Sequence, residues 1–454
     1  MKTYIKIYIL LLSMGISACE GFLDAKPEKS LVVPSELNEL QALLDNGNTM
    51  NVFSGISDIG TDDLELEEGA ISGLSNPVVE GNSYLWKPDI LEGFGFTEWN
   101  GNYTRILYSN VVLEQIERIA LTEANQTEWN LVKGSALFYR AASFLDLLMV
   151  FGPAYQEATA SSELGIPLRL SPEVQFELER STVEETYSRI IEDLEGAYGL
   201  LPERYSDYAT RPSKQAVTAM FSMVYLYRGD FQSSERYAKE SLSYGGELMD
   251  FNTLDPSARF PVSQFNTEVV FHALMNSYSY IRQQTTYIDG ELVDSYQEGD
   301  LRKNVFFTPA KKEGKFNFRG NYSSGTRGFN GIALDEIYLI LSESLIRQGK
   351  LEEGMDVLNE FLATRWSANT FQPIQAENEV EALEIVLEER RKTLVMRGRR
   401  WADLKRLNLE DRFRKTLERN YGGQKYSLEP GSPRYVYPIP EDEISQNPIV
   451  QNSR

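Results

Sequence analysis

A single cysteine, Cys19, limits how this chain of 454 residues can stabilise a fold. No disulfide can form within the chain, so stability must come from the packing of an apolar core. The chain is long enough to build a substantial core, either as one large domain or as a pair of ordinary ones.

Cys19 also lies where a bacterial lipoprotein carries its lipid. It follows Lys2 and Lys6, an apolar stretch too short to span a bilayer, and a tract of small residues that ends at Ala18. We expect residues 1–18 to be a signal peptide whose removal leaves an acylated Cys19 at the new N-terminus. A plain signal peptide with an incidental cysteine is the alternative interpretation.

The chain is strongly acidic. Its formal net charge is −22, and loss of Lys2 and Lys6 with the signal peptide takes it to −24. Such a surface repels nucleic acid and anionic lipid headgroups, so we expect no nucleic-acid partner. A tether at residues 19–35 would connect the lipid anchor to the folded domain. No other apolar run approaches the length of a spanning helix, which predicts a protein that sits on a membrane without crossing it.

Residues 36–454 have the pattern of a mainly α-helical domain. Apolar residues recur at helical spacing in three segments, residues 36–46, 97–150 and 378–396. The capping box of Thr182 and Glu185 predicts the start of a further helix that ends at Pro202.

Two segments, residues 212–245 and 332–366, match each other when Gly229 is aligned with Gly349. Small residues then match small ones, apolar residues match apolar ones, and the glycine separates two amphipathic helices in each segment. This pattern is typical of tetratricopeptide hairpins, although each copy is degenerate. Unrelated helices that share a turn are the alternative.

The expected helical-repeat scaffold covers residues 97–245 and 332–410. Loop-rich insertions are expected at residues 50–96 and 246–331, with few short strands, because glycine, asparagine, serine and proline are frequent there. A loop region of this length is usually functional, or else contains elements that the pattern misses. The proline-rich tail at residues 425–454 is predicted to be extended.

Several segments match one known family in sequence order. They are residues 19–24, Trp99 with Tyr103, Ile106 and Asn110, residues 133–141, residues 152–153, and residues 437–448. The most recognisable match is residues 388–391 leading to residues 400–406. Together these segments span nearly the whole mature chain. The sequence therefore resembles the SusD/RagB family, surface lipoproteins that partner outer-membrane nutrient transporters in Bacteroidetes.

The resemblance implies a SusD-like fold and a lipid-anchored place on the outer membrane, facing the outside. It also implies a protein partner, a SusC-type TonB-dependent barrel on which the protein sits as a lid. The cargo of such proteins is a glycan, or in some members a peptide.

Trp86 and Tyr84 are the first candidates for ligand binding, because an aromatic ring in a loop can stack on the C–H face of a sugar. Filling of the core is the alternative role for Trp86. The resemblance places the ligand platform partly in this N-terminal stretch and partly in the insertion between the helical repeats. By position it adds further candidates, which are Tyr278, Tyr280, Tyr287, Arg319 and Tyr322.

Asp62 and Asp63 belong to an acidic run that is expected to form a solvated loop. Acceptance of hydrogen bonds from sugar hydroxyls is the second interpretation. Such carboxylates also suit calcium, but the spacing of an EF-hand is absent, so we assign no metal and no cofactor.

No residue pattern indicates catalysis. His272 is the single histidine and lies in a run typical of a buried strand, which disfavours a zinc site or a Ser/His triad. In the arginine-rich block at residues 390–406, Asp403 and Glu389 are expected to pair with arginines while Trp401 fills the core. We expect a non-enzymatic binding protein. Oligopeptide cargo, a surface hydrolase and a protein-only adaptor are the alternatives.

Overall fold

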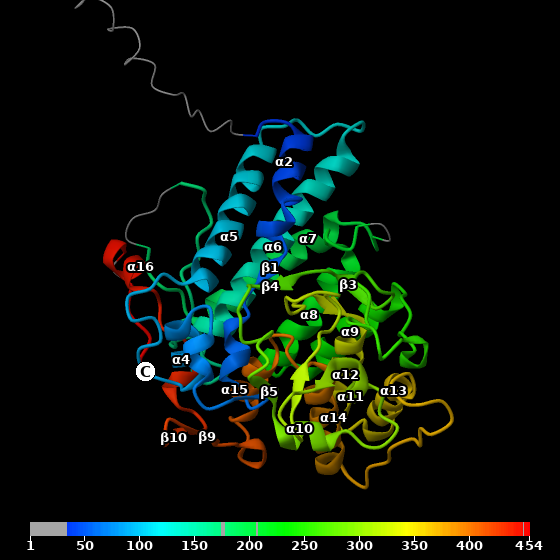
Figure 1. Cartoon of the computed structure of the whole chain (residues 1–454). Helices are drawn as coiled ribbons and strands as arrows, with labels where there is room; N and C mark the ends of the chain where they lie inside the picture. The colour runs from blue at the N-terminus through cyan, green and yellow to red at the C-terminus, as the bar shows by residue number, and fades with distance from the viewer. Residues whose placement is uncertain (1–33, 174–177, 206–207, 448) are drawn as a thin grey trace, which may run out of the picture.

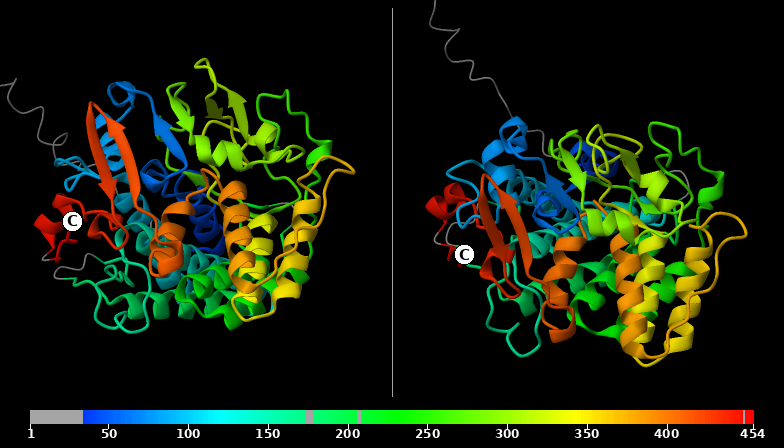
Figure 2. Two further views of the ribbon diagram at one scale, coloured as in Figure 1. Left: turned by 90° about the horizontal axis from the view of Figure 1, so that it is seen from below. Right: turned by 60° about the horizontal axis from the view of Figure 1, so that its bottom comes forward.

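Helices form a scaffold, and a layer of loops and short strands covers one side of it (Figure 1 and Figure 2). The computed structural model describes residues 34–173, 178–205, 208–447 and 449–454. Cys19, the predicted signal peptide 1–18 and the predicted tether up to residue 33 lie outside the described residues. The predicted mainly α-helical fold class is confirmed.

The N-terminal half of the scaffold is built around α6 (Gln126–Phe151), which packs between α5 (Thr97–Ile116) and α7 (Val183–Leu200). The predicted short helix, α2 (Leu37–Leu44), packs against α5 and α6. The predicted capping box starts α7, because the Thr182 side chain accepts from the Glu185 amide and the Glu185 side chain accepts from the Thr182 amide.

α6 is long and apolar enough to cross a membrane, a property that the sequence reading missed. However, 83 % of its most apolar stretch is buried inside the protein. Its apolar residues therefore face other helices, as in the core helix of a large domain.

The predicted helical hairpins are present. α8 (Lys214–Arg228) and α9 (Phe231–Ser243) form one, and α12 (Leu334–Ile346) and α13 (Leu351–Ala363) form the other. Gly229 and Gly349 occupy the same left-handed conformation at the two turns, each with a φ of 76°. That conformation strains residues with a side chain, which explains why glycine stands at both turns.

Small residues hold each hairpin closed. The Ser234 hydroxyl donates to the Ser222 carbonyl at 2.8 Å in the first hairpin, and the Ser342 hydroxyl donates to the Gly354 carbonyl at 2.7 Å in the second. The hydroxyls of Ser344 and Ser234 lie 2.9 Å apart and join α12 to α9. The two hairpins therefore stack on each other, as repeats of a helical solenoid do.

α14 (Glu379–Thr393) packs on α12 and α13, and α15 (Arg400–Leu407) follows it. In the loop-rich layer, residues 50–96 and 246–331 do not remain separate insertions. β1 (Val52–Phe53) pairs with β4 (Leu274–Met275), and β2 (Leu64–Leu66) pairs with β5 (Thr286–Ile288). The two insertions therefore form one layer, in which every described sheet has two strands.

Further elements complete this layer. Residues 47–96 contribute α3 (Gly47–Met50), the 3-10 turns η1 (Ile56–Gly60) and η2 (Ala70–Gly73), and α4 (Pro77–Tyr84). Residues 246–333 contribute η3 (Phe251–Thr253), β3 (Val269–Phe271), α10 (Gly290–Ser295), α11 (Arg302–Phe306), β6 (Phe307–Pro309), β7 (Phe316–Phe318) and β8 (Ile332–Ala333). β3 pairs with β8, and β6 forms a hairpin with β7.

The prediction of an extended tail at residues 425–454 is right for the strand β10 and wrong where short helical elements interrupt the tail. After η4 (Asp411–Phe413), β9 (Leu417–Tyr421) and β10 (Gln424–Leu428) form an antiparallel hairpin. Gly422 and Gly423 make its turn with φ values of 61° and 71°, a two-residue turn typical of hairpins. η5 (Pro433–Tyr435) and α16 (Glu441–Gln446) follow.

The close approach of α12 and α13 leads to a testable prediction. A Cβ atom at Gly354 would lie 2.5 Å from Cγ1 of Ile346 and 3.0 Å from the Ser342 carbonyl oxygen, so one of them must move. We expect Gly354→Ala to lower the free energy of unfolding by about 1–3 kcal/mol in urea denaturation. Gly199→Ala, on the open side of α7, is the matched control and should raise it by about 0.5–1 kcal/mol. Equal effects of the two changes would contradict the packing argument.

Candidate ligand-binding site

Two open clefts lie in the loop-rich layer, and the β6–β7 hairpin contributes residues to the lining of both. The first, which we call the acidic cleft, has a volume of about 610 Å³ and lies between β2, the loop after α4, α10 and the start of β9. The second, which we call the arginine pocket, has a volume of about 390 Å³. The hairpin contributes Lys312 to the acidic cleft and Thr308 and Phe318 to the arginine pocket. Figure 2 shows this hairpin projecting from the loop-rich side together with β9 and β10.

The acidic cleft contains three of the predicted site residues, Asp62, Tyr84 and Trp86. Carboxylates dominate its lining, and they are Asp62, Glu65, Glu67, Glu68, Asp289, Glu291 and Glu418. The basic groups in the lining are Lys312, Lys415 and Arg419.

Trp86 is not an exposed platform, and that part of the prediction is wrong. Its side chain is 1 % exposed, and the indole Nε1 donates to the Gly60 carbonyl at 2.8 Å. The Arg419 guanidinium lies 4.4 Å from the centre of the Trp86 ring and 3.8 Å from the centre of the Tyr84 ring. The two rings and Arg419 therefore form a packed floor under the cleft, as the core alternative for Trp86 describes.

Tyr84 has no exposed face either. Its hydroxyl accepts a hydrogen bond from the Leu66 amide at 3.0 Å, and its ring meets the Tyr421 ring edge-on. Arg419 donates to the carbonyl oxygens of Tyr84 and Thr61, and burial lowers the pKa of Arg419 to about 10. These contacts fix the loop after α4 against β9.

The prediction that Asp62 and Asp63 form a solvated loop is also wrong. Arg400 binds both oxygens of Asp62 at 2.8 Å, Lys415 donates to Asp62 at 2.9 Å, and Arg391 binds Asp63 at 2.8 Å. Burial acts to raise the pKa of Asp62, but the neighbouring cations outweigh it and hold this pKa well below its usual range. For Asp63, burial prevails and raises the pKa. Both carboxylates are therefore committed to internal ion pairs.

The four candidate tyrosines of the insertion lie in the interior instead of on one surface. The Tyr280 hydroxyl donates to the Gly55 carbonyl at 2.5 Å, and the Tyr278 ring stacks on the Tyr280 ring. The Tyr322 hydroxyl donates to Glu268, and the Tyr287 hydroxyl donates to Glu67 at 3.0 Å. Each side chain is at least nine-tenths buried, so their expected role as exposed stacking surfaces is wrong.

Arg319 is the predicted residue that reaches the arginine pocket. The sequence did not identify the other charged and aromatic side chains that line this pocket. They are Arg259, Phe260, Arg282, Phe318 and Arg327. The sequence feature that could have indicated the pocket is the presence of these arginines in the insertion at residues 246–331 of an otherwise acidic chain.

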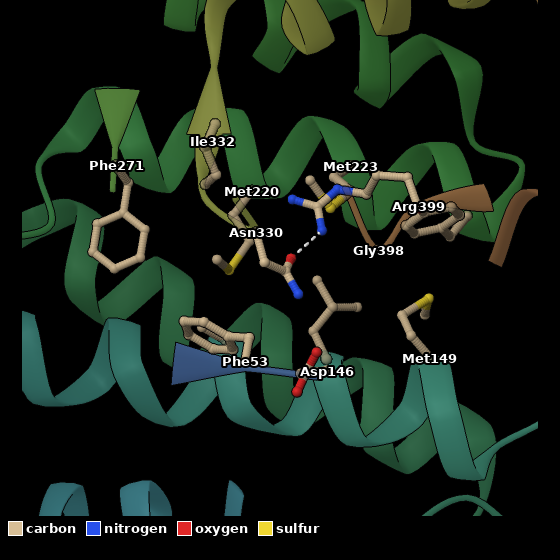
Figure 3. A pocket seen from close by; sticks show the side chains of 13 residues that line it. Phe53, Asp146, Met149, Met220, Met223, Phe271, Asn330, Ile332, Gly398 and Arg399 are labelled. Atoms are coloured by element: carbon tan, nitrogen blue, oxygen red, sulfur yellow. Dashed lines mark hydrogen bonds between the residues drawn. The ribbon is translucent and has the colours of Figure 1, made fainter. Parts of the chain in front are cut away.

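A third, much smaller cavity lies between α6, α8 and the loop before α15 (Figure 3). Its volume is about 60 Å³, which is room for a few water molecules and too small for a sugar. Arg399 donates to the Asn330 side chain at 2.5 Å, and Asp146 accepts from Ser54 and Asn102, each at 2.7 Å. These polar groups are hydrogen-bonded within the protein, and we assign the cavity to the scaffold.

Among the described residues there is no group of three or more His, Cys, Asp or Glu side chains placed to hold a metal ion. His272 directly follows β3 and is buried against Phe265 and Phe329, with Gln264 at 3.2 Å from its Nε2 atom. In the arginine-rich block, Asp403 pairs with Arg390 at 2.8 Å, as predicted.

Two family models match the sequence. One, described as starch-binding and associating with the outer membrane, matches residues 21–226. The other, described as the SusD family, matches residues 334–453. The second match contains the arginine-rich block and the helical hairpin that precedes it.

Individual proteins are similar over nearly the same length. SusD-like protein P2 of Formosa agariphila is 24 % identical over 449 residues, which covers 84 % of each chain. A solved structure of a putative sugar binding protein from Bacteroides vulgatus has a TM-score of 0.75 at 21 % identity and covers 92 % of this chain and 99 % of that chain. A laminarin binding SusD-like protein has a TM-score of 0.63 at 19 % identity, with coverages of 92 % and 96 %. These structures establish a shared fold.

The buried position of Trp86 can be tested by its effect on stability. We expect Trp86→Ala to lower the free energy of unfolding by about 3–5 kcal/mol, because it removes a fully packed ring and its hydrogen bond to Gly60. Phe94→Ala is the matched aromatic control; Phe94 is 53 % exposed, so the change should stay within about 0.5 kcal/mol. Urea denaturation followed by circular dichroism measures both. A Trp86→Ala protein as stable as Phe94→Ala would show that the ring does not pack in the interior.

His272 provides a pH-dependent test. Burial lowers its pKa from 6.5 to about 4, so between these values the unfolded chain binds a proton that the folded protein does not. Stability from this residue is therefore lost as pH falls from 6.5 toward 4. We expect the free energy of unfolding of the native sequence to fall in this range relative to His272→Gln, with a constant difference above pH 7. A difference that stays constant down to pH 4 would contradict the burial of the imidazole.

Proposed function

Because the chain belongs to the SusD family, we propose that it captures oligosaccharides at the outer membrane and delivers them to a SusC-type TonB-dependent transporter. We further propose that it is lipid-anchored through Cys19, that it faces the outside of the cell, and that it acts without catalysis. The family description, which links starch binding with the outer membrane, supports the place and the cargo.

Two similar proteins favour a saccharide as the ligand. One is described as a putative sugar binding protein and the other as laminarin binding, and both share the fold over most of this chain. The N-terminal sequence supports the anchor, since Cys19 follows a charged and then apolar segment of signal-peptide type.

The observation that carries the proposal is the pair of open clefts in a loop-rich layer on a rigid helical scaffold. Their volumes, about 610 and 390 Å³, lie in the usual range for small-molecule sites. The arginine pocket combines half-buried Phe260 and Phe318 with polar groups. A sugar needs this combination, because its C–H face packs on a ring while its hydroxyls seek fixed polar partners.

Peptide cargo remains the second candidate, and one observation favours it. The five tryptophans, the strongest stacking residues for sugars, are all buried or partly buried. An extended peptide does not need a stacking platform, because its backbone supplies donors and acceptors for polar groups in a cleft.

Calorimetric titration of the purified chain with oligosaccharides and with extended peptides tests the proposed cargo. We expect saturable binding of a saccharide, weakened about 3–10-fold by Phe318→Ala because a stacking face is lost. Phe94→Ala is the control, since Phe94 is exposed and lines neither cleft, and it should bind like the native sequence. Binding of peptides without binding of any saccharide would contradict saccharide capture and would support peptide cargo. Release of a hydrolysed product would overturn the non-catalytic role.

Delivery to a transporter is tested separately. Outer membranes that contain the full lipidated chain should yield it together with a TonB-dependent barrel after mild detergent extraction and affinity purification. A Cys19→Ser chain should be missing from the membrane fraction. Recovery of the native chain without a barrel partner would contradict the delivery step.

A further inference from the structure

We propose that the arginine pocket binds an anionic group, so that the saccharide ligand carries carboxylate or sulfate substituents. This inference rests on the proposed function and narrows its substrate class. The pocket lies between residues 257–260, residues 281–282, the β6–β7 hairpin and residues 319–327.

Four arginines line this pocket: Arg259, Arg282, Arg319 and Arg327. Among the described residues that line it there is no Asp or Glu. The chain has a net charge of −22, so its overall electrostatic potential is negative. A pocket lined by four arginines makes the potential locally positive.

None of these four guanidinium groups forms an ion pair with a carboxylate in the part of the chain that the structure describes. The arginines of the scaffold behave differently, since Arg390, Arg400 and their neighbours bind fixed carboxylates. Asp255, the acid next to the pocket in sequence, has its carboxylate engaged by the amide and hydroxyl of Ser257, at 2.8 and 2.7 Å.

Neutral contacts hold two of the arginines in position. Arg327 donates through Nε and Nη2 to the Met275 carbonyl, at 2.9 and 2.7 Å, and Arg319 donates to the Pro256 carbonyl. Burial is the one cause that lowers the pKa of each, without a compensating anion. A bound anion would supply the missing negative charge, and a guanidinium fork matches the geometry of carboxylate and sulfate oxygens.

The remaining two arginines, Arg259 and Arg282, are exposed at the mouth of the pocket. The Arg259 guanidinium lies 5.2 Å from the centre of the Phe260 ring. Phe260 and Phe318 present apolar surface beside the cations, so a charged sugar can place its ring on a phenyl face and its anionic substituent among the guanidinium groups.

The acidic cleft strengthens this assignment. It borders the turn of the same β6–β7 hairpin through Lys312, and its carboxylates outnumber its basic groups. The acidic cleft therefore repels an anionic ligand, and the arginine pocket attracts it. This difference in charge favours binding of an anionic ligand in the arginine pocket.

The experiment uses the double variant Arg259→Gln/Arg282→Gln, because both side chains are exposed and neither supports the fold through an ion pair. The matched control is Arg204→Gln/Arg236→Gln, which removes the same charge from exposed positions outside the pocket. Calorimetry compares three tetrasaccharides of equal length: one of uronic acids, one of sulfated galactose and one of neutral glucose. A single-stranded DNA oligomer of equal charge is the fourth probe.

We expect the native sequence to bind one of the two anionic tetrasaccharides at least about 10-fold more tightly than the neutral one. The pocket double variant should lose about 10-fold or more of this affinity, while the control double variant should keep it. The preferred tetrasaccharide distinguishes a carboxylate from a sulfate ligand, and binding should weaken with added salt.

Different failures have different meanings. Tighter binding of the neutral tetrasaccharide, or equal binding by the pocket variant, overturns the anionic class and leaves the proposed saccharide capture intact. Equal binding of the DNA oligomer also overturns it, because the pocket would then attract any anion. Absence of binding by every saccharide, together with peptide binding, overturns the proposed function itself.

Discussion

A set of buried ion pairs between the arginine-rich block and two distant parts of the chain holds the architecture together. Arg400 binds Asp62 and Arg391 binds Asp63, each at 2.8 Å, while Arg406 binds Glu343 in α12. The first two pairs fix the N-terminal loops to α14 and α15, and the third fixes α15 to the helical hairpin. Removing one partner of such a pair leaves an uncompensated buried charge, at a cost of about 3–5 kcal/mol.

The burial of Trp86 is consistent with these pairs. Because Asp62 and Asp63 are drawn onto α14 and α15, the adjoining loops lie against the C-terminal hairpin instead of projecting into solvent. Trp86 then lies between the Gly60 carbonyl and the Arg419 guanidinium. Its φ of 51° is in the left-handed region, which a residue with a side chain occupies only when its surroundings over-determine it.

The sequence contains enough local information to predict the scaffold, and much less to predict the loop-rich layer. Helical periodicity, the Thr182 capping box and the matched glycines Gly229 and Gly349 are signals within one turn or one hairpin, and all describe the structure correctly. The pairing of β1 with β4 joins residues more than two hundred positions apart, and strands this short have no pattern of their own. Whether an aromatic residue in such a layer is exposed depends on those distant partners, so the sequence could not decide it for Trp86.

The charged residues of the loop-rich layer can be interpreted more directly than its aromatic residues. Once the fold is known, each arginine either has a carboxylate partner or has none. Arginines in the scaffold have carboxylate partners, for example Arg390 with Asp403, and they serve stability. Arg259, Arg282, Arg319 and Arg327 come from separate stretches of one insertion and meet in one pocket without such partners. Two of them, Arg319 and Arg327, are half-buried and are held by backbone carbonyls, so their positive charge stays available to a bound anion. Arginines that the fold does not neutralise therefore mark the place where we propose that the ligand carries negative charge.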